Sequence, residues 1–250
     1  MKIDLVDRVI ILTGAGGGIG SASVRLLVEC GAHVVCVDQN AEALQELAKG
    51  LPQDQITIIP VAVTDAASAS RVIELSMARH TRLDALIHMS AVLEALEIDD
   101  VTEDQWQNHM GVNINATFFL ASAVANIMKD QDNGGRIILM SSVALLSCGM
   151  STRLPYATTK GAVTTMARGL AKAYGPYGIT VNTIAPGLID TAMMRKGLSD
   201  SARRQMEEAT PLKRFGTPEE VASVVAFLAS DAASFISGAT INVSGGFTLY

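Results

Sequence analysis

The stretch TGAGGGIG at residues 13–20 follows the apolar run VIIL of residues 9–12 and leads directly into a helical pattern. Glycines allow a tight turn between a strand and a helix, and they let a pyrophosphate approach the N–H groups at the helix N-terminus. The spacing G-x-G-x-x-G is not met, whereas T-G-x-x-x-G-x-G is met. The stretch therefore predicts a phosphate-binding turn, and the alternative is an ordinary glycine-rich corner.

The rest of the chain continues this alternation of short apolar runs and amphipathic segments. Buried strands are predicted at about 9–12, 32–37, 56–63, 83–88, 136–140, 179–184 and 240–243. Helices are predicted at about 18–30, 40–49, 65–80, 102–128, 155–175 and 217–230. Strands that alternate with helices indicate βαβ crossovers and a parallel sheet. We therefore expect one α/β domain over residues 1–250, a doubly wound sheet of about seven strands flanked by helices.

Composition narrows the function classes. The 250 residues are 49% hydrophobic and 18% charged with a net charge of −6, which excludes disorder and disfavours bulk binding to nucleic acid. No uninterrupted apolar run approaches the roughly 18 residues of a membrane span, and the N-terminus lacks a signal-peptide layout. Three cysteines (Cys30, Cys36 and Cys148) and four scattered histidines match neither a disulfide framework nor a metal site. We expect a cytoplasmic, reduced protein without a metal.

An acidic residue stands where the second predicted strand ends. Asp38 lies a little over twenty residues beyond the glycine turn, and Gln39 follows it. A carboxylate at this point accepts hydrogen bonds from the adenosine ribose hydroxyls and repels a 2′-phosphate. The glycine turn itself holds no Lys or Arg. The electrostatics therefore favour NAD over NADP, and the alternative is that Asp38 caps the next helix.

Tyr156 and Lys160 open the helix that follows the fifth predicted strand. Residues four apart share a helix face, so the two side chains stand side by side. A free tyrosine titrates near pH 10, and an adjacent ammonium lowers the pKa of the phenol. The pair then suits proton exchange with an alcohol or carbonyl, the alternative being a core tyrosine beside a solvated lysine. Ser141 and Ser142 end the fifth strand without a G-x-S-x-G elbow, which disfavours a hydrolase.

Two longer segments lie at the carboxyl edge of the predicted sheet, where open parallel sheets bind their ligands. Residues 92–101 follow the fourth strand and carry four acidic side chains. Residues 187–216 follow the sixth strand and mix apolar side chains with charges of both signs. The second segment is long enough to form a substrate lid at about 188–215, and the alternative is a solvated helical excursion.

Four features in this order resemble the short-chain dehydrogenase/reductase family over nearly the whole chain: the glycine turn, Asp38, Ser142, and Tyr156 with Lys160. Further matches are Asn113, Pro186-Gly187, Asp190-Thr191 and the ending SGATINVSGG at residues 237–246. The resemblance implies a single-domain Rossmann fold and a nicotinamide cofactor. It also implies assembly into homotetramers through the helices at about 102–128 and 155–175.

The resemblance assigns a role to each matching residue. Tyr156 would be the general acid/base, Lys160 would lower its pKa and bind the nicotinamide ribose, and Ser142 would orient the reacting oxygen. Asn113 would hold a water in a proton relay to Lys160. Cofactor contacts are expected from Gly14, Gly16, Gly17, Gly18, Ile19, Gly20, Asp38, Val63, Ser90, Ala91, Tyr156, Lys160, Pro186, Gly187, Ile189 and Thr191.

The chain departs from the family's pattern at three places. After the fourth strand it reads HMSA at residues 88–91, where the family usually has Asn-Asn-Ala-Gly, and this bears on the affinity for the cofactor. Ala62 stands where an aspartate often contacts adenine, which leaves Val63 as an apolar adenine wall. Ser142 precedes Tyr156 by fourteen positions, one more than usual, so we expect an altered loop around 148–154.

We therefore expect an NAD-dependent oxidoreductase that moves a hydride between nicotinamide and a secondary alcohol or ketone. The walls of the substrate pocket are expected at residues 89–94, 148–154 and 191–198. One alternative is an epimerase or lyase on the same fold that uses tightly held NAD. The other is a non-catalytic NAD-binding protein. The sequence names neither the substrate nor the physiological direction.

Overall fold

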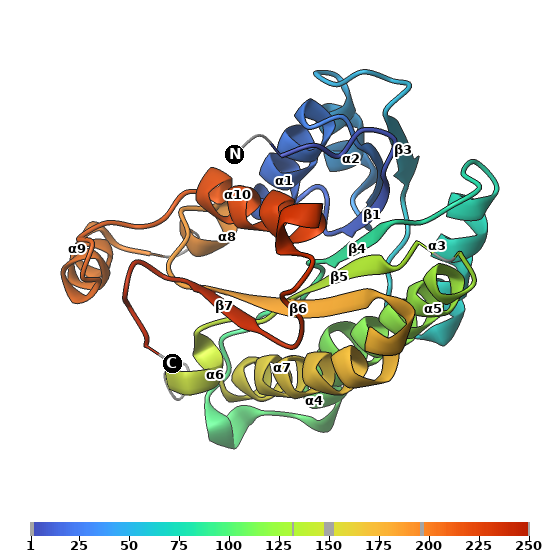
Figure 1. Cartoon of the computed structure of the whole chain (residues 1–250). Helices are drawn as coiled ribbons and strands as arrows, with labels where there is room; N and C mark the ends of the chain where they lie inside the picture. Colours follow the sequence, from blue (N-terminus) through green and yellow to red (C-terminus); the bar gives the residue numbers. More distant parts are fainter. Residues whose placement is uncertain (1–2, 132, 148–152, 196–197, 250) are drawn as a thin grey trace.

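Seven parallel strands form one central sheet in the residues that the structure describes (Figure 1). The structure is a computed structural model, and it describes residues 3–131, 133–147, 153–195 and 198–249. The spatial order of the strands is β3-β2-β1-β4-β5-β6-β7, so the order reverses between β1 and β4. The strands are β1 (Val9–Thr13), β2 (His33–Val37), β3 (Ile56–Ile59), β4 (Ala85–His88), β5 (Gly135–Met140), β6 (Ile179–Pro186) and β7 (Thr240–Val243). The predicted doubly wound α/β fold is confirmed.

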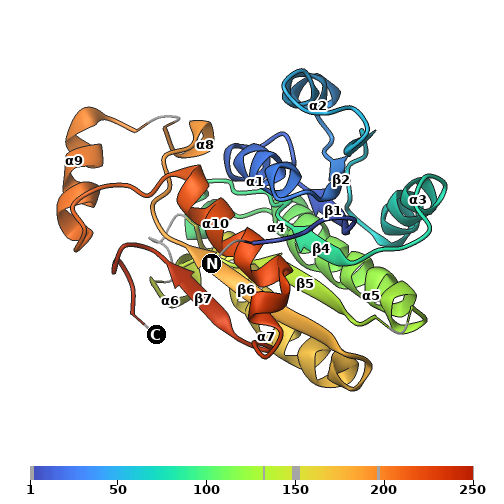
Figure 2. The ribbon, with the colours of Figure 1, turned by 45° about the horizontal axis from the view of Figure 1, so that its top comes forward.

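Helices cover both faces of this sheet (Figures 1 and 2). One face carries α1 (Gly18–Glu29), α2 (Ala41–Ala48) and α10 (Pro218–Ala229), and the other carries α3 (Ala66–Met77), α5 (Ala116–Lys129) and α7 (Leu154–Tyr174). Successive strand side chains point to opposite faces, so Ile10 and Leu12 enter the first core while Ile11 enters the second. Because both faces are covered, the strands read as continuous apolar runs.

Two predicted elements differ in detail. β3 ends at Ile59 rather than at residue 63, because Pro60 has no N–H to continue the ladder. The predicted helix 102–128 is α4 (Glu103–Met110), a π-helical turn (Gly111–Asn115) and α5 in one continuous rod. Short helices complete the chain: α6 (Ala144–Ser147), α8 (Ala192–Arg195), α9 (Asp200–Ala209) and the 3-10 turns Ile98–Asp100, Gly175–Tyr177 and Asp231–Ala233. Figure 2 shows α9 standing apart from the sheet and its helical layers.

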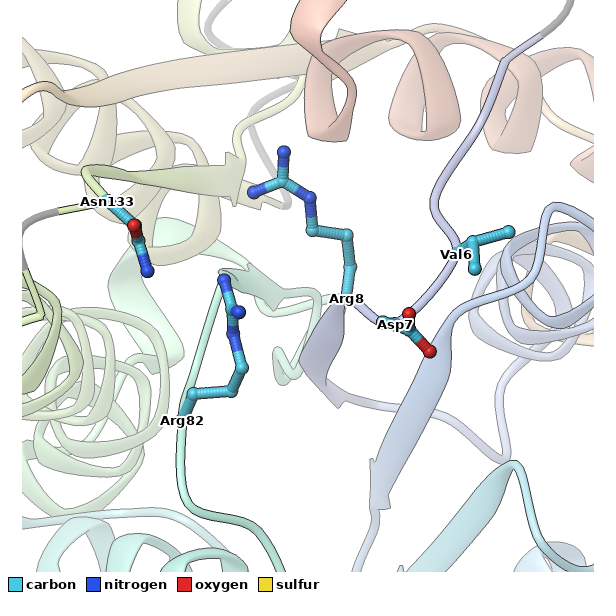
Figure 3. A pocket seen from close by; sticks show the side chains of 5 residues that line it. All are labelled: Val6, Asp7, Arg8, Arg82 and Asn133. Carbon is cyan, nitrogen blue, oxygen red and sulfur yellow. The ribbon is translucent and has the colours of Figure 1, made fainter.

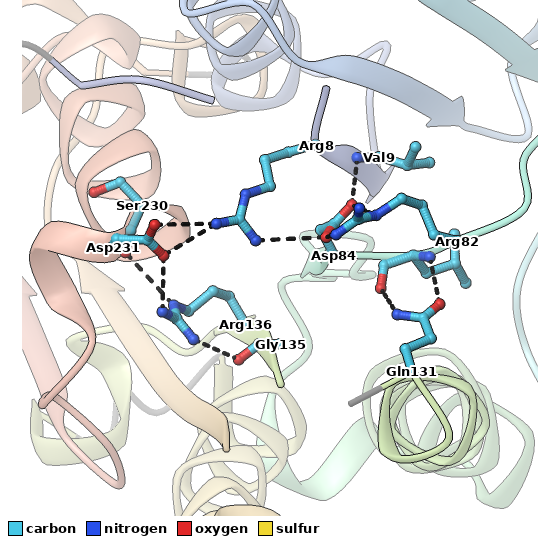
Figure 4. A network of polar contacts seen from close by, with 10 residues as sticks. Arg8, Val9, Arg82, Asp84, Gln131, Gly135, Arg136, Ser230 and Asp231 are labelled. Carbon is cyan, nitrogen blue, oxygen red and sulfur yellow. Dashed lines mark hydrogen bonds and ion pairs between the residues drawn. The ribbon is translucent and has the colours of Figure 1, made fainter. Parts of the chain in front are cut away.

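A network of charged side chains joins the amino ends of the central strands (Figure 4). Asp84, which is buried just before β4, pairs with Arg82 and, at 3.5 Å, with Arg8. Arg8 also reaches Asp231 at 3.0 Å, and Arg136 of β5 binds the same carboxylate at 3.2 Å. The network therefore ties β1, β4 and β5 to the turn that follows α10.

A hollow of about 310 Å³ lies beside this network. Figure 3 shows the side chains that line it: Val6, Asp7, Arg8, Arg82 and Asn133. Both of its arginines already bind carboxylates. It also lies at the amino edge of the sheet, whereas open parallel sheets bind ligands at the carboxyl edge. The carboxyl edge is therefore the edge where a ligand is expected.

The helical rod Glu103–Lys129 is the one stretch among the described residues that could cross a membrane by length and composition, with a mean hydropathy of 1.3. Core helices of soluble proteins pass the same test. Here α5 contributes seven buried residues, among them Leu120 and Val124, to the core between the sheet and α3. The rod thus acts as a core helix of this fold.

Candidate active site

The glycine turn between β1 and α1 is shaped to receive an anion. Gly14 has a φ of +71°, a conformation that favours glycine. A Cβ on Gly20 would lie 2.0 Å from the Gly14 carbonyl oxygen, so any larger residue would force the turn open. Gly17 caps α1 without a side-chain hydrogen bond, and the first turn of the helix holds no acidic residue. The N–H groups of this helix end therefore suit a phosphate, and the residues fit a dinucleotide.

Asp38 lies beside this turn at the end of β2. Its Oδ2 accepts a hydrogen bond from the Gly16 N–H at 3.0 Å, and its Oδ1 accepts one from the Asn40 N–H at 2.9 Å. The side chain that caps α2 is that of Asn40, which accepts from the Ala43 N–H. The alternative that Asp38 caps this helix is therefore wrong. The half-buried carboxylate is instead fixed against the glycine turn.

Residues 88–91 lie against the other side of the turn. Thr13 Oγ1 accepts hydrogen bonds from the N–H groups of Met89 (3.1 Å) and Ser90 (3.3 Å), which leaves its own hydrogen for His88 Nδ1 at 2.9 Å. Burial, with a contribution from the charge of Lys160, lowers the pKa of His88 to about 3, so the imidazole is neutral. His88 thus keeps a hydrogen-bonded link between β4 and β1 at the position where the family's motif has asparagine.

The ends of β5 and α7 bring Ser142, Tyr156 and Lys160 together. The Ser142 side chain forms a hydrogen bond with the side chain of Tyr156. Lys160 Nζ lies 5.4 Å from the centre of the Tyr156 ring and donates to the Met140 carbonyl oxygen at 2.8 Å. The two side chains therefore share one face of α7, as their spacing predicted.

Burial dominates the proton affinities of this pair. It raises the pKa of Tyr156, and the Ser142 hydrogen bond and the Arg153 charge oppose it only in part. Burial also lowers the pKa of Lys160 to about 8. The prediction that the neighbouring lysine leaves Tyr156 with a lowered pKa is therefore wrong for this structure. The physical reason is that removing the phenolate from water outweighs its favourable contacts.

Asn113 lies in the π-helical turn and is buried. Its Oδ1 accepts from the Val92 N–H at 2.8 Å, and its Nδ2 donates to the Val92 carbonyl and to Thr159 Oγ1, both at 3.0 Å. The side-chain amide is thus committed to two neighbours, one of them adjacent to Lys160 in sequence. Asn113 holds the segment after β4 against α7.

Residues 186–191 close the site from the side of β6. Pro186 ends that strand, and Ile189 pairs with Gly216 in an isolated parallel bridge. A Cβ on Gly18 would lie 3.0 Å from Thr191 Cγ2, so the start of α1 and residue 191 are in direct contact. Gly187 packs as closely on Ser244, because a Cβ there would lie 2.8 Å from the Ser244 Cα. Of the predicted nicotinamide-side residues, Thr191 therefore lies next to the glycine turn.

Ion pairs of Asp190 connect parts of the predicted lid at about 188–215. Asp190 pairs with Arg195 at 2.7 Å and with Arg203 of α9 at 3.2 Å, and these hydrogen bonds lower the pKa of Asp190 to about 2. Arg203 also stacks on the Phe215 ring at 4.6 Å. The helix α9 has no buried residue of its own. Side-chain pairs therefore hold α9, whereas Ile189 and Phe215 anchor the two ends of the segment by burial.

The remaining predicted contacts are only partly described. Val63 is buried and Ala91 is half-buried near the ends of β3 and β4. The predicted wall at 148–154, with Cys148, lies outside the described residues except for Arg153 and Leu154.

Known proteins resemble this chain over nearly its full length. The sequence profile described as Enoyl-(Acyl carrier protein) reductase matches residues 14–248. The NAD-dependent glycerol dehydrogenase of Listeria innocua is 31% identical over 98% of this chain and 96% of that protein. The 3-oxoacyl-(acyl-carrier-protein) reductase FabG of Rickettsia conorii is 35% identical over 99% of both chains. The chain belongs to the short-chain dehydrogenase/reductase family.

A solved structure agrees with this assignment. The Brucella melitensis short-chain dehydrogenase/reductase named glucose/ribitol dehydrogenase superposes with a TM-score of 0.93 at 33% identity, over all of both chains. The short-chain dehydrogenases and reductases that match this chain are oxidoreductases of alcohol and carbonyl groups, and this chain shares their class.

Sequence reasoning missed two contributors to this short-chain dehydrogenase/reductase site. Thr159 binds Asn113, and Arg153 acts on Tyr156 through its charge. The signal for both was their place on the helix of Tyr156 and Lys160, one residue before the lysine and three before the tyrosine.

Proposed function

We propose that the protein interconverts a secondary alcohol and a ketone, with NAD as the hydride carrier and Tyr156 as the general acid/base. One observation carries this proposal: the Ser142 side chain hydrogen-bonds Tyr156, and Lys160 Nζ lies 5.4 Å from the Tyr156 ring. The charge of Lys160 acts on His88, and His88 binds Thr13 at the start of the glycine turn that fits a dinucleotide. Membership of the short-chain dehydrogenase/reductase family supports the reaction class.

In this proposal Tyr156, Ser142 and Lys160 have separate roles in the proton transfer. A bound nicotinamide supplies the acceptor or donor of the hydride. In the oxidative direction the Tyr156 oxygen takes the hydroxyl proton of the alcohol, and Ser142 hydrogen-bonds the reacting oxygen. The ammonium of Lys160 stabilises the phenolate that the reaction needs. With a pKa of about 8, Lys160 is mostly protonated at pH 7.

Asn113 supports this proton path by position. Both N–H donors of its amide are occupied by Val92 and Thr159, so a relay water would have to donate to an oxygen of Asn113, in the side chain or in the backbone. The backbone carbonyl oxygen of Asn113 accepts a hydrogen bond from Thr117 Oγ1 at 2.8 Å.

Asp38 is the basis for the preference for NAD over NADP. Its carboxylate is fixed by the N–H groups of Gly16 and Asn40, and a 2′-phosphate placed there would meet a like charge. We expect Asp38→Ala with Gln39→Arg to raise kcat/KM for NADPH and lower it for NADH. Steady-state rates with both cofactors measure this change. A wild type that already prefers NADPH would contradict the assignment.

A substrate panel tests the reaction class. The protein is incubated with NAD⁺ and a set of sugars, hydroxy acids, sterols and cyclic alcohols, and the absorbance of reduced nicotinamide is followed. We expect NADH with at least one secondary alcohol and none with a matched tertiary alcohol, which has no hydrogen on the carbinol carbon. Conversion of a substrate without net NADH would instead indicate an epimerase or lyase that uses tightly held NAD.

A further inference from the structure

Arg153 is unlike the other arginines of the described chain. Seven arginines form ion pairs with carboxylates. Five have neither an ion pair nor a side-chain hydrogen bond to a described residue, and four of these are exposed to solvent: Arg25, Arg79, Arg168 and Arg204. Arg153 is the fifth. It is partly buried, and its Nε is a fully buried donor that has no acceptor among the described residues.

The fold puts this guanidinium at the reaction centre. Arg153 is the N-cap of α7, three residues before Tyr156, and its positive charge acts on the phenol. Three residues of helix advance about 4.5 Å along the axis, so the backbone of Arg153 lies within one helical turn of Tyr156, and its charge is close enough to lower the pKa of the phenol. No side chain among the described residues caps α7 at this end, so the positive end of the helix dipole adds to the charge of Arg153.

The other cations around the site are already engaged. Lys160 Nζ donates to the Met140 carbonyl oxygen at 2.8 Å. The lid arginines Arg195 and Arg203 both bind Asp190. None of the four acidic residues in segment 92–101 forms an ion pair with a described cation. Among the described residues, Arg153 is therefore the cation of this site that is left to bind a ligand.

We infer that Arg153 binds an anionic group of the substrate, which is then a secondary alcohol or ketone that carries a carboxylate, sulfonate or phosphate a few bonds from the reacting carbon. A guanidinium presents its N–H donors in a planar fork that matches an oxyanion, and a buried Nε–H gains the acceptor that it lacks. The inference rests on the proposed function and deepens it. The reaction stays balanced: the alcohol gives a hydride to NAD⁺ and a proton to Tyr156, while the anionic group is unchanged.

A set of compounds on one 2-hydroxypropyl frame tests this inference. 3-Hydroxybutanoate, 2-hydroxypropane-1-sulfonate and propane-1,2-diol 1-phosphate carry the three anions, and 3-hydroxybutanamide is the neutral match for the carboxylate. We expect the wild type to prefer at least one anion over the amide by roughly 10- to 100-fold in kcat/KM, the range of a hydrogen bond to a charged group. The three anions distinguish which head group is preferred.

Two variants assign the preference to Arg153. Arg153→Gln should raise KM for the preferred anion by roughly 10- to 100-fold more than it raises KM for the amide, since the effect of its charge on Tyr156 is common to both substrates, while Arg153→Lys should keep part of the preference. The matched control Arg79→Gln removes an exposed, unpaired arginine at the opposite edge of the sheet. It should leave KM unchanged for both the anion and the amide. Thermal unfolding of each variant checks that the fold is intact.

A binding measurement separates this inference from the proposed function. Calorimetry with NADH-loaded protein and the unreactive propane-1-sulfonate should show binding to the wild type that Arg153→Gln weakens at least about tenfold. Absence of turnover with every alcohol, together with this Arg153-dependent binding, would reject the oxidoreductase but keep the anion site. The inference would be overturned if Arg153→Gln lowered kcat/KM equally for the anionic substrate and for the amide. It would also be overturned if the substitution left the affinity for propane-1-sulfonate unchanged.

Discussion

Burial of the Lys160 ammonium destabilises the folded chain, whereas the proposed reaction needs its charge. Its pKa falls from 10.5 to about 8 because folding removes the ammonium from water. Below pH 8 both the folded and the unfolded chain bind the proton, so folding carries the full desolvation cost of about 3 kcal/mol. Between pH 8 and 10.5 only the unfolded chain binds it, so stability rises with pH, and above 10.5 the cost is gone.

We expect Lys160→Met to remove this dependence. The free energy of unfolding, measured in urea from pH 7 to 10.5, should increase for the wild type by about 3 kcal/mol relative to this variant across the window. The control Lys49→Met removes an exposed lysine and should show no such trend. A constant difference between wild type and Lys160→Met would contradict the burial of the charge.

For single residues, the sequence predicts which side chains lie side by side better than it predicts their pKa values. The spacing of Tyr156 and Lys160 predicted their shared face, because helix geometry alone determines it. Their pKa values depend on burial, which no spacing reveals. The free guanidinium of Arg153 escaped notice for a similar reason: the sequence shows a cation near the tyrosine but not which carboxylates bind the other arginines.

Among the elements, the amino ends of β1, β4 and β5 depend on one buried carboxylate (Figure 4). Asp84 is 3% exposed, accepts from the Val9 N–H at 2.9 Å and binds Arg8 and Arg82. We expect Asp84→Ala to cost about 3–5 kcal/mol in free energy of unfolding, because it leaves the buried Val9 N–H and the Arg82 guanidinium without their acceptor, and leaves Arg8 with Asp231 alone. Urea denaturation measures the loss.

Asp231 provides a matched control within the same network. It also binds two arginines, Arg8 and Arg136, but its side chain is 73% exposed. Asp231→Ala should therefore cost less than about 1 kcal/mol, since water replaces the lost contacts. Equal costs for the two substitutions would show that burial does not decide the strength of this network.

The sequence predicts the long elements well and the irregular ones poorly. Apolar periodicity located the seven strands and the six long helices because it reports burial on a sheet face. The π-helical turn at Gly111–Asn115 carries no such signal, although it is the turn that places Asn113 against Val92 and Thr159. The helix α9 has no buried residue, so its amphipathic pattern did not mark it as part of a core.

For the whole molecule we expect a homotetramer that pairs the α4–α5 rod and α7 with other copies. Phe118 and Phe119 of α5 are 44% and 39% exposed and pack edge to face with centroids 5.5 Å apart. Exposed aromatic pairs of this kind mark interaction surfaces. Light scattering should give four chains of 26.3 kDa for the wild type and a smaller species for Phe118→Glu with Phe119→Glu. Val6→Glu, at another exposed apolar position, should leave the mass unchanged. A monomeric wild type would contradict this expectation.

In the proposed function, the activity of the whole molecule depends on the phenol of Tyr156. Tyr156→Phe removes one oxygen and leaves the glycine turn, Asp38 and Lys160 in place. We predict that kcat for the best substrate falls by roughly 10²- to 10⁴-fold, while the affinity for NADH, measured by fluorescence titration, stays within a few-fold of wild type. A variant that turns over substrate at the wild-type rate would contradict the account, because another group would then have to move the proton.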